Sequence, residues 1–343
     1  MESEFLPLVF VRPVGFSAAD SLRLIAAAQR MNEQVRWRLA PIGVQTDVYL
    51  AHRDRITYRD PPARRSSSLP PSIPTGSFDT FSGRHEHSRL WIDAQGRHKT
   101  APVCILGRAN TQASPESYLD QPPPLDFPLA LEELRLGLAK AAGDLIALRS
   151  LYALGLGAWQ ERHRWKSHRL HLSHGARLIA VIEPEHWKIH LLIGTTAEQI
   201  AASNMTSVPQ TTPFGHEGFA QLMLETALWE FAKRCPEPLL PSMLPSVFLR
   251  MPLTHRRPSE FTEEALGDHC VAILLALDTR SRTADELQAS LRLSRPALLR
   301  ALACLALSRC IRPERERRSL AWAMSGWLPN SLRKRLFGTS QWF

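Results

Sequence analysis

Six histidines lie close together in the middle of the sequence, and imidazole is a common metal ligand that also moves protons near neutral pH. They are His163, His168, His171, His174, His186 and His190. A zinc site needs three or four ligands that converge on one point. His171 and His174 fall on opposite faces of an extended segment, and no cysteine or carboxylate pair joins them at ligand spacing. We therefore expect strand histidines that face solvent, and no metal site.

Other motifs that would indicate an enzyme are missing from the sequence. The triplet His85-Glu86-His87 is too short for the helical HExxH pattern of zinc proteases. The glycines of residues 155–165 do not form a phosphate-binding loop, and there is no GxSxG nucleophile motif. We predict no catalytic residue and no cofactor. An enzyme of unknown class in residues 150–260 is kept as a third alternative.

Basic residues gather near the end of the chain, where they could contact phosphates or an acidic partner. From Cys310 to Gly338 there are seven basic residues and two acidic ones, so this stretch carries +5 of the net charge of +9. Arginine is common throughout, as in proteins from GC-rich bacterial genomes, so its position is more informative than its number. The residues expected to bind a nucleic acid or a protein partner are Arg295, Arg300, Arg309, Arg315, Arg317, Arg318, Arg333, Lys334 and Arg335.

The elements that position these arginines are three short helices predicted within residues 268–325. The second helix opens on Thr283 with Glu286 three residues later, a capping box that satisfies free amides at the helix start. Ser294 caps the third helix, and Pro296 lies in its first turn, where a missing N–H has no cost. The third helix then carries a core stripe at i, i+4 and i+7, formed by Leu298, Leu302 and Leu305.

A charged turn, residues 313–318, then separates Ile311 from an alternating run at Leu320, Trp322 and Met324. This order of helices, turn and two strands resembles a winged helix-turn-helix domain, which would occupy residues 261–343. The resemblance implies that residues 295–309 form the recognition helix. That helix is mostly Ala, Leu and Cys, whereas base readout draws on Arg, Lys, Asn and Gln. Protein contact is therefore slightly favoured over DNA contact. A basic amphipathic tail over 327–337 is expected to pack on this domain, with docking on an acidic partner or a membrane surface as the alternatives.

The N-terminal part, residues 1–149, alternates between apolar strand-like runs and helix-like periodicity, which is typical of a small parallel α/β domain. Between two of the strands, residues 53–88 are rich in Pro, Ser and Arg and predict a long loop. The predicted strands are 5–11, 35–39, 47–51, 89–94 and 102–107, and the predicted helices are 17–31 and 128–148.

This N-terminal order of elements resembles a response-regulator receiver domain. A receiver carries an acidic pair after its first strand, where this chain has Arg12-Pro13. It carries a phosphate-accepting Asp at the end of its third strand, where this chain has His52, with Asp54 two residues beyond. It carries a Lys after its last strand, where this chain has Arg108. The resemblance therefore implies a degenerate receiver that is not phosphorylated, because no carboxylate cluster is present to hold Mg²⁺.

The middle part, residues 150–260, predicts a small α+β domain. The runs 169–173, 176–183 and 186–194 alternate like strands of a meander, and residues 217–235 have the apolar period of a helix. The predicted fold class is thus α/β plus α+β, in three domains.

Bulk properties limit the function. A chain of 343 residues holds two or three domains, 44% of it is hydrophobic, and no apolar run reaches the length of about 18 residues needed to span a membrane. Five scattered cysteines and an acidic N-terminus without a basic region indicate a cytoplasmic protein. We expect a non-enzymatic regulatory protein that brings a partner or small signal to a winged-helix output, with a homodimer left open. The alternative is a DNA-binding transcription regulator.

Overall fold

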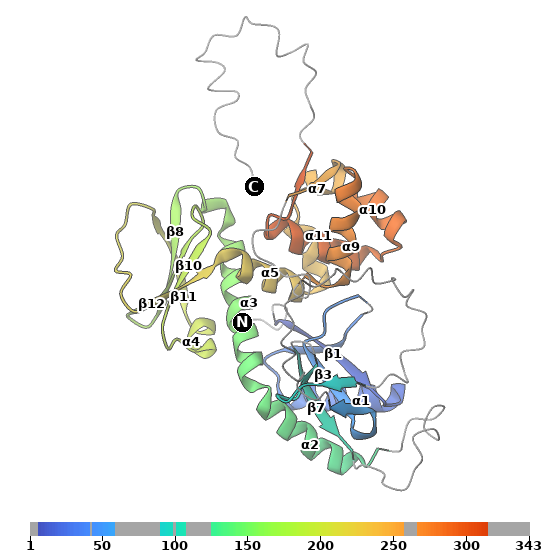
Figure 1. The fold of residues 1–343 in the computed structure, drawn as a ribbon. Coiled ribbons are helices and arrows are strands. Elements are labelled where there is room, and N and C mark those ends of the chain that lie inside the picture. Colours follow the sequence, from blue (N-terminus) through green and yellow to red (C-terminus); the bar gives the residue numbers. More distant parts are fainter. Residues whose placement is uncertain are drawn as a thin grey trace, which may run out of the picture. The chain divides into compact units, whose positions relative to one another are not determined.

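The computed structural model describes residues 6–41, 43–58, 90–98, 101–107, 125–256 and 266–314 (Figure 1). It is a mixed α/β structure that divides into two compact units, Met1–Arg149 and Ser150–Phe343. The second unit contains both the predicted middle domain and the predicted winged-helix segment. None of the helices in the described part of the chain has both the length and the apolar character that a membrane crossing requires.

A five-stranded sheet with the order β2-β1-β3-β7-β6 forms the centre of the first unit. The first four strands run parallel, and the short β6 closes a hairpin with β7. The parallel core of the N-terminal prediction is confirmed. The strands are β1 (Leu8–Val14), β2 (Arg36–Leu39), β3 (Val48–His52), β6 (Arg97–His98) and β7 (Ala101–Leu106).

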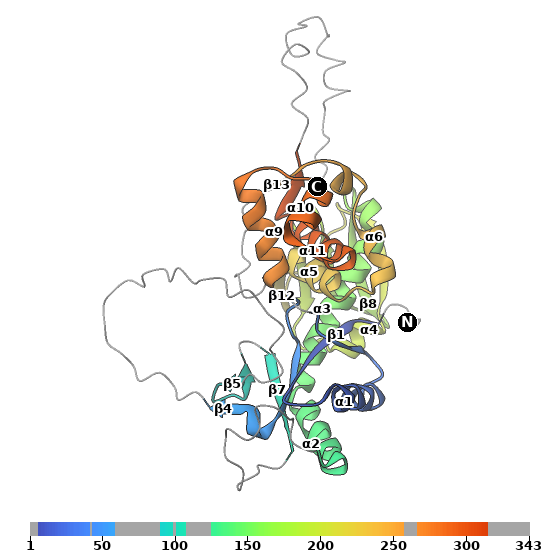
Figure 2. The ribbon, with the colours of Figure 1, turned by 90° about the vertical axis from the view of Figure 1, so that its right-hand side faces the viewer.

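Two helices, α1 (Ala18–Met31) and α2 (Phe127–Lys140), pack on one face of this sheet (Figure 2). Helix α1 begins where the sequence predicts, because the hydroxyl of Ser17 accepts the backbone N–H of Asp20 at 3.0 Å. Alternate residues of the buried strands point toward the helices, so the core between them is continuous. Its buried members include Val9, Val11, Leu24, Val48, Leu50, Cys104, Leu106 and Leu134.

The opposite face of the sheet is covered by a second, two-stranded parallel sheet. The strands β4 (Ile56–Tyr58) and β5 (Leu90–Ile92) pair with each other, and Leu90 and Ile92 pack against Tyr49 and Ala51 of β3. The predicted strand at 89–94 therefore exists, but contrary to the prediction it does not join the main sheet. Most of the predicted 53–88 loop lies outside the described residues.

The second unit contains a five-stranded antiparallel sheet with the order β11-β8-β9-β10-β12. The predicted meander is confirmed by β8, β9 and β10. The predicted helix over 217–235 is wrong in its first third, because β12 pairs along β10 before the helix α5 (Leu224–Arg234) begins. The strands are β8 (His168–His174), β9 (Arg177–Glu183), β10 (Lys188–Leu192), β11 (Asn204–Pro209) and β12 (Phe219–Met223).

The predicted helix over 128–148 is interrupted at Ala141, and a second helix, α3 (Ala142–Gln160), continues well beyond the predicted end. Its glycines were not expected in a helix. Gly155 and Gly157 lie where a Cβ atom would collide with the carbonyl oxygen of Ala227 and with the side chain of Met205. Close packing of backbone on α3 thus explains glycine in a helix interior.

The C-terminal helices are α9 (Asp268–Thr279), α10 (Ala284–Leu291) and α11 (Arg295–Leu307). The capping box at Thr283 and Glu286 and the cap at Ser294 are confirmed. The strand β14 (Ile311–Pro313) follows, and it pairs with β13 (Leu253–His255), which comes before the helices. Leu253 also forms a bridge with Arg282. The partner strand expected from 320–324 lies outside the described residues.

Helix α11 is the central helix of this part of the molecule. Ten consecutive residues, Leu298–Leu307, are buried, among them Leu302 at 0% exposure as predicted. The helix packs against α5, α6 (Leu240–Met243) and α9. The predicted middle domain and the predicted winged-helix segment therefore share one core. The short α4 (Ala197–Ala201) and α7 (Val247–Arg250) complete the unit.

Candidate functional site

The carboxyl ends of β1, β3 and β7 meet at the position where ligands bind in open parallel α/β sheets. Strand β1 ends at Val14, three residues later than expected, so Gly15 and Phe16 follow the strand instead of Arg12-Pro13. Arg12 lies within β1. The third strand ends at His52, as expected, and β7 ends next to Gly107. Arg108 lies outside the described residues.

His52 is almost completely buried at this edge, with 2% of its surface exposed. Its Nδ1 atom accepts the backbone N–H of Asp54 at 3.4 Å, so the neutral ring carries its proton on Nε2. The ring meets Phe16 edge-on, with ring centroids 5.7 Å apart. Burial lowers the pKa of His52 below its ordinary value, against the opposing effect of the nearby Asp54 carboxylate. His52 therefore acts as a neutral, hydrogen-bonded core residue.

Glu133 of α2 closes the site from the helix side. Its Oε2 accepts the backbone N–H of Gly107 at 2.6 Å, and its Oε1 lies 3.6 Å from Nη2 of Arg53. Nε of Arg53 in turn donates to the carbonyl oxygen of Gly107 at 3.0 Å. The ends of β3 and β7 and helix α2 are thus joined by a closed circuit of two charge-assisted hydrogen bonds and one ion pair.

Gly107 is required by this arrangement. Its φ is +86°, and a Cβ atom there would lie 2.6 Å from Nε2 of His52. No group of three or more His, Cys, Asp or Glu side chains within the described ranges could hold a metal ion. Asp47, the other acid near β3, uses Oδ2 to accept the N–H of Phe10 at 2.9 Å. The chemistry of this edge is that of a tightly joined structural network.

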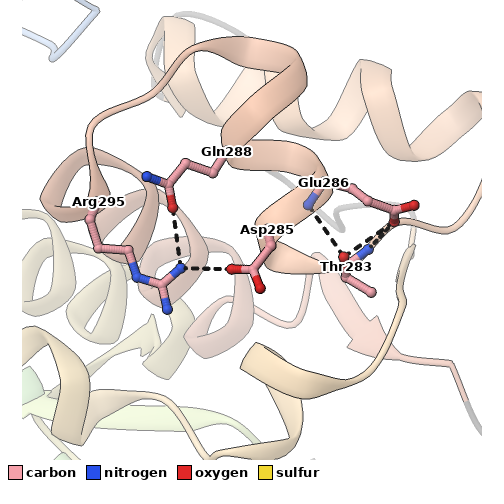
Figure 3. Close-up of polar contacts among 5 residues, drawn as sticks. All are labelled: Thr283, Asp285, Glu286, Gln288 and Arg295. Carbon is pink, nitrogen blue, oxygen red and sulfur yellow. Dashed lines mark hydrogen bonds and ion pairs between the residues drawn. The ribbon is translucent and has the colours of Figure 1, made fainter.

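The predicted binding arginines occupy three different environments. Arg295 lies on the surface at the start of α11, with 42% of its side chain exposed. Its Nη1 is 3.3 Å from Oδ1 of Asp285 and 3.3 Å from Oε1 of Gln288, both on α10 (Figure 3). Such contacts between exposed groups are weak, so the guanidinium can exchange them for a partner.

Arg300 does not lie on a surface, contrary to the prediction. It is 9% exposed, and its Nη1 donates to the carbonyl oxygens of Lys233 at 2.9 Å and Cys235 at 2.6 Å. These carbonyls belong to the C-terminal end of α5, where a positive charge favours the helix dipole. Arg300 therefore attaches α5 to α11, and it is not placed to bind a phosphate.

Arg309 follows α11 in the left-handed conformation, with φ of +61°. Its guanidinium carbon lies 4.7 Å from the ring centroid of Trp187, a cation–π contact with the turn between β9 and β10. Burial lowers the pKa of Arg309, and the neighbouring Arg256 acts in the same direction. The remaining predicted residues, Arg315, Arg317, Arg318, Arg333, Lys334 and Arg335, lie outside the described residues.

Glu133 and Glu183 have roles in the structure that were not predicted from the sequence. Glu183 ends the apolar run of β9 on the same face as Val181, and it is only 7% exposed. A charged residue on the buried side of a strand pattern is a usable signal, since such a group needs a partner. Glu133 gives no such signal, because charged residues are ordinary on a helix.

Comparisons with known proteins add no relative. The chain matches no protein-family model, and it matches neither a curated protein nor a solved structure.

Proposed function

We propose that this chain is a non-enzymatic regulatory protein that acts by binding a protein partner through the C-terminal part of its second unit. Its first unit is a receiver-like module that is not phosphorylated. The observation that carries the proposal is the burial of α11, the helix that would read bases in a winged helix-turn-helix protein.

A recognition helix needs an exposed face that enters the major groove and presents several polar side chains to the base edges. In α11 only the first turn, Arg295–Ala297, has accessible side chains, and the following ten residues are buried. Of the predicted contact residues on this helix, Arg300 is committed to the carbonyl groups of α5. This distribution supports a protein-binding role more than sequence-specific DNA readout.

The outer face of α9 supplies a surface for such a partner. Leu275 is 49% exposed, and it shares its helical face with Asp268, Val271 and Asp278 at i, i+3, i+7 and i+10. An exposed leucine between acidic side chains suits a partner that presents an apolar contact with basic residues at its rim.

The receiver likeness of the first unit is supported by strand order. The parallel strands follow β2-β1-β3-β7, which corresponds to the first four positions of the flavodoxin-like order. His52 and Arg53 follow at the end of β3, where a receiver has its phosphate acceptor. Arg53 and Glu133 are both engaged with Gly107 at these strand ends, where a receiver would offer carboxylates to Mg²⁺, which supports a module that signals without phosphorylation.

DNA binding is the second candidate, because Cys310–Gly338 carries seven basic and two acidic residues. Contacts from such a stretch would be mainly to phosphates, so the affinity would depend strongly on salt and little on sequence.

Two measurements test the proposal. Affinity purification from the source cells should recover a partner with the wild-type chain but not with Leu275→Asp. Leu22→Asp is a matched control, because Leu22 is a 59% exposed leucine on α1 of the other unit. Fluorescence anisotropy at moderate salt should show no binding to any of several duplexes. Binding to all of the duplexes that weakens steeply as salt is raised, together with the same recovered proteins for Leu275→Asp and the wild type, would favour the DNA-binding candidate.

A further inference from the structure

The segment 210–218 connects the two outermost strands of the antiparallel sheet. It leaves β11 at one edge and enters β12 at the other, so it must pass β8, β9 and β10. Four strand spacings amount to about 19 Å, a distance that nine residues can span. We call this segment the strap.

The sheet face beneath the strap is rich in polar side chains. The register places His171, Val181 and His190 in one row across β8, β9 and β10. The prediction that the strand histidines face solvent is wrong for His190, which is only 7% exposed. Because side chains alternate between faces, Arg169 lies on the same face as His171, and Glu183 on the same face as Val181. The opposite face of the same strands carries apolar residues such as Leu170, Ile182 and Ile189, which are fully buried.

Phe214 anchors the strap on this face. Its ring centroid lies 5.2 Å from that of His190 and 6.5 Å from that of His171, and the Arg169 guanidinium carbon is 5.5 Å from it. The ring of His216 contacts the rings of Phe214 and His190, with centroid distances of 4.1 Å and 5.0 Å respectively. The strap backbone is held as well, because Nη1 of Arg169 donates to the carbonyl oxygen of Thr212 at 2.9 Å.

The carboxylate of Glu183 balances the charges at the centre of this cluster. Its Oε1 lies 2.7 Å from Nε of Arg169, and its Oε2 lies 3.0 Å from Nε2 of His190. Both of its oxygens are therefore engaged. The groups of the sheet that face the strap and carry or can gain positive charge are Arg169, His171, Lys188 and His190, and the strap itself carries His216 and Glu217.

We propose that the strap is an acid-released latch, closed over the sheet near neutral pH and opened when His171 becomes protonated. The polar face with Arg169, Glu183 and His190 would then be uncovered.

His171 shows why protonation opposes closure. Its Nε2 atom is buried and makes no hydrogen bond within the described part of the chain. A proton added there would place a charge without a partner beside Arg169. Burial lowers the pKa of His171, and Arg169 lowers it further. The closed state therefore binds fewer protons than the open one, so closure is complete above the ordinary histidine pKa of about 6.5 and weakens as pH falls below it.

Hydrogen–deuterium exchange of the full chain at pH 7.5 and pH 5.5, corrected for the intrinsic pH dependence of exchange, tests the latch. The strap amides of Gln210 and Thr212, and the amide of Phe219 where β12 begins, donate to the carbonyl oxygens of Ser167, Pro209 and His216 and report on closure. Their protection should fall about tenfold or more at pH 5.5, while the amides of Ile182 and Ile189 within the sheet stay protected.

One variant and a control complete the test. His171→Gln should remove the acid effect, because glutamine does not titrate. His174→Gln, an exposed histidine outside the cluster, should behave like the wild type. Circular dichroism should show that both variants are folded at both pH values. Unchanged strap protection in the wild type, or an equal drop in His171→Gln and the wild type, would overturn the proposal.

Discussion

Nη1 of Arg300 donates a hydrogen bond to the carbonyl oxygen of Cys235 at 2.6 Å, across 65 residues of sequence. The same nitrogen reaches the carbonyl oxygen of Lys233, so one buried guanidinium satisfies two carbonyls at the end of α5. One of the arginines predicted to bind a nucleic acid or a protein partner is thus an internal helix cap.

Replacing Arg300 by Ala should lower the free energy of unfolding by about 2–4 kcal/mol, because charged hydrogen bonds are removed and buried carbonyls are left without donors. Urea denaturation of the full chain measures this change. Arg295→Ala is the control, since exposed ion pairs contribute about 0–1 kcal/mol. Equal stabilities of the two variants would contradict the capping role of Arg300.

Leu302→Ala should cost about 2–5 kcal/mol in urea denaturation, because Leu302 is fully buried and the smaller side chain leaves a cavity. Leu275→Ala on the exposed face of α9 should change stability by no more than about 0.5 kcal/mol. If Leu302→Ala unfolds at the wild-type midpoint, α11 is not packed as described.

Gly107→Ala should destabilise the first unit by about 2–4 kcal/mol, since the new methyl group would meet the His52 ring in a backbone conformation that disfavours L residues. Gly96→Ala separates the steric clash from the backbone strain. Gly96 also has a positive φ, +73°, but it has open space around it, so a destabilisation of about 1 kcal/mol is expected from backbone strain alone. Adding His52→Ala to Gly107→Ala should recover part of the stability. Additive effects of these two substitutions in a double-mutant cycle would exclude the clash.

Incubation with acetyl phosphate and Mg²⁺ should leave the protein without a phosphoryl group. Asp47 is engaged with the backbone of β1, and Asp54 lies 3.7 Å from the buried His52 ring, so neither belongs to a Mg²⁺-binding cluster of the described carboxylates. Intact-protein mass spectrometry makes the measurement. A base-labile phosphate on Asp47 or Asp54 would refute the prediction.

Replacing Arg315, Arg317 and Arg318 together by Ala tests the second candidate function. If the chain binds DNA through these residues, the triple variant should bind every sequence more weakly, and the slope of log affinity against log salt should flatten by roughly 0.9 for each arginine–phosphate interaction that the substitutions remove. Anisotropy titrations from low to moderate salt provide the slope. An unaltered slope would remove these three arginines from DNA binding and leave protein binding as the better explanation.

The sequence predicted most elements whose local pattern determines them. The strands ending at His52 and Leu106, the helix capped by Ser17 and the capping box at Thr283 are all confirmed. Elements fixed by distant partners were missed. Strand β12 has the apolar period of a helix, and it is extended because β10 provides a free edge. Helix α3 contains glycines that local propensity penalises, but close packing at Ala227 requires them.

The candidate site was harder to predict than the fold. His52 could be placed at the end of its strand because strand ends follow from the local pattern. Its contacts with Gly107 and Glu133 join three elements separated along the chain, and no local pattern contains that information. Arg300 was misassigned for a related reason. An arginine in a helix is usually exposed, and Arg300 is buried because α5, which is distant in sequence, packs against α11.

The pairing of β13 with β14 also bears on how the protein is made. Thr254 and Arg312 lie 58 residues apart in sequence but opposite each other in the small sheet. At ribosomal rates of about 5–20 residues per second, β13 waits roughly 3 to 12 seconds for its partner to be synthesised. During that time its edge and the α5 surface that later receives α11 are open to other chains. Slow translation of residues 256–314 would therefore favour binding of chaperones to the unpaired edge of β13. Substitutions of exposed helix residues would not change this waiting time.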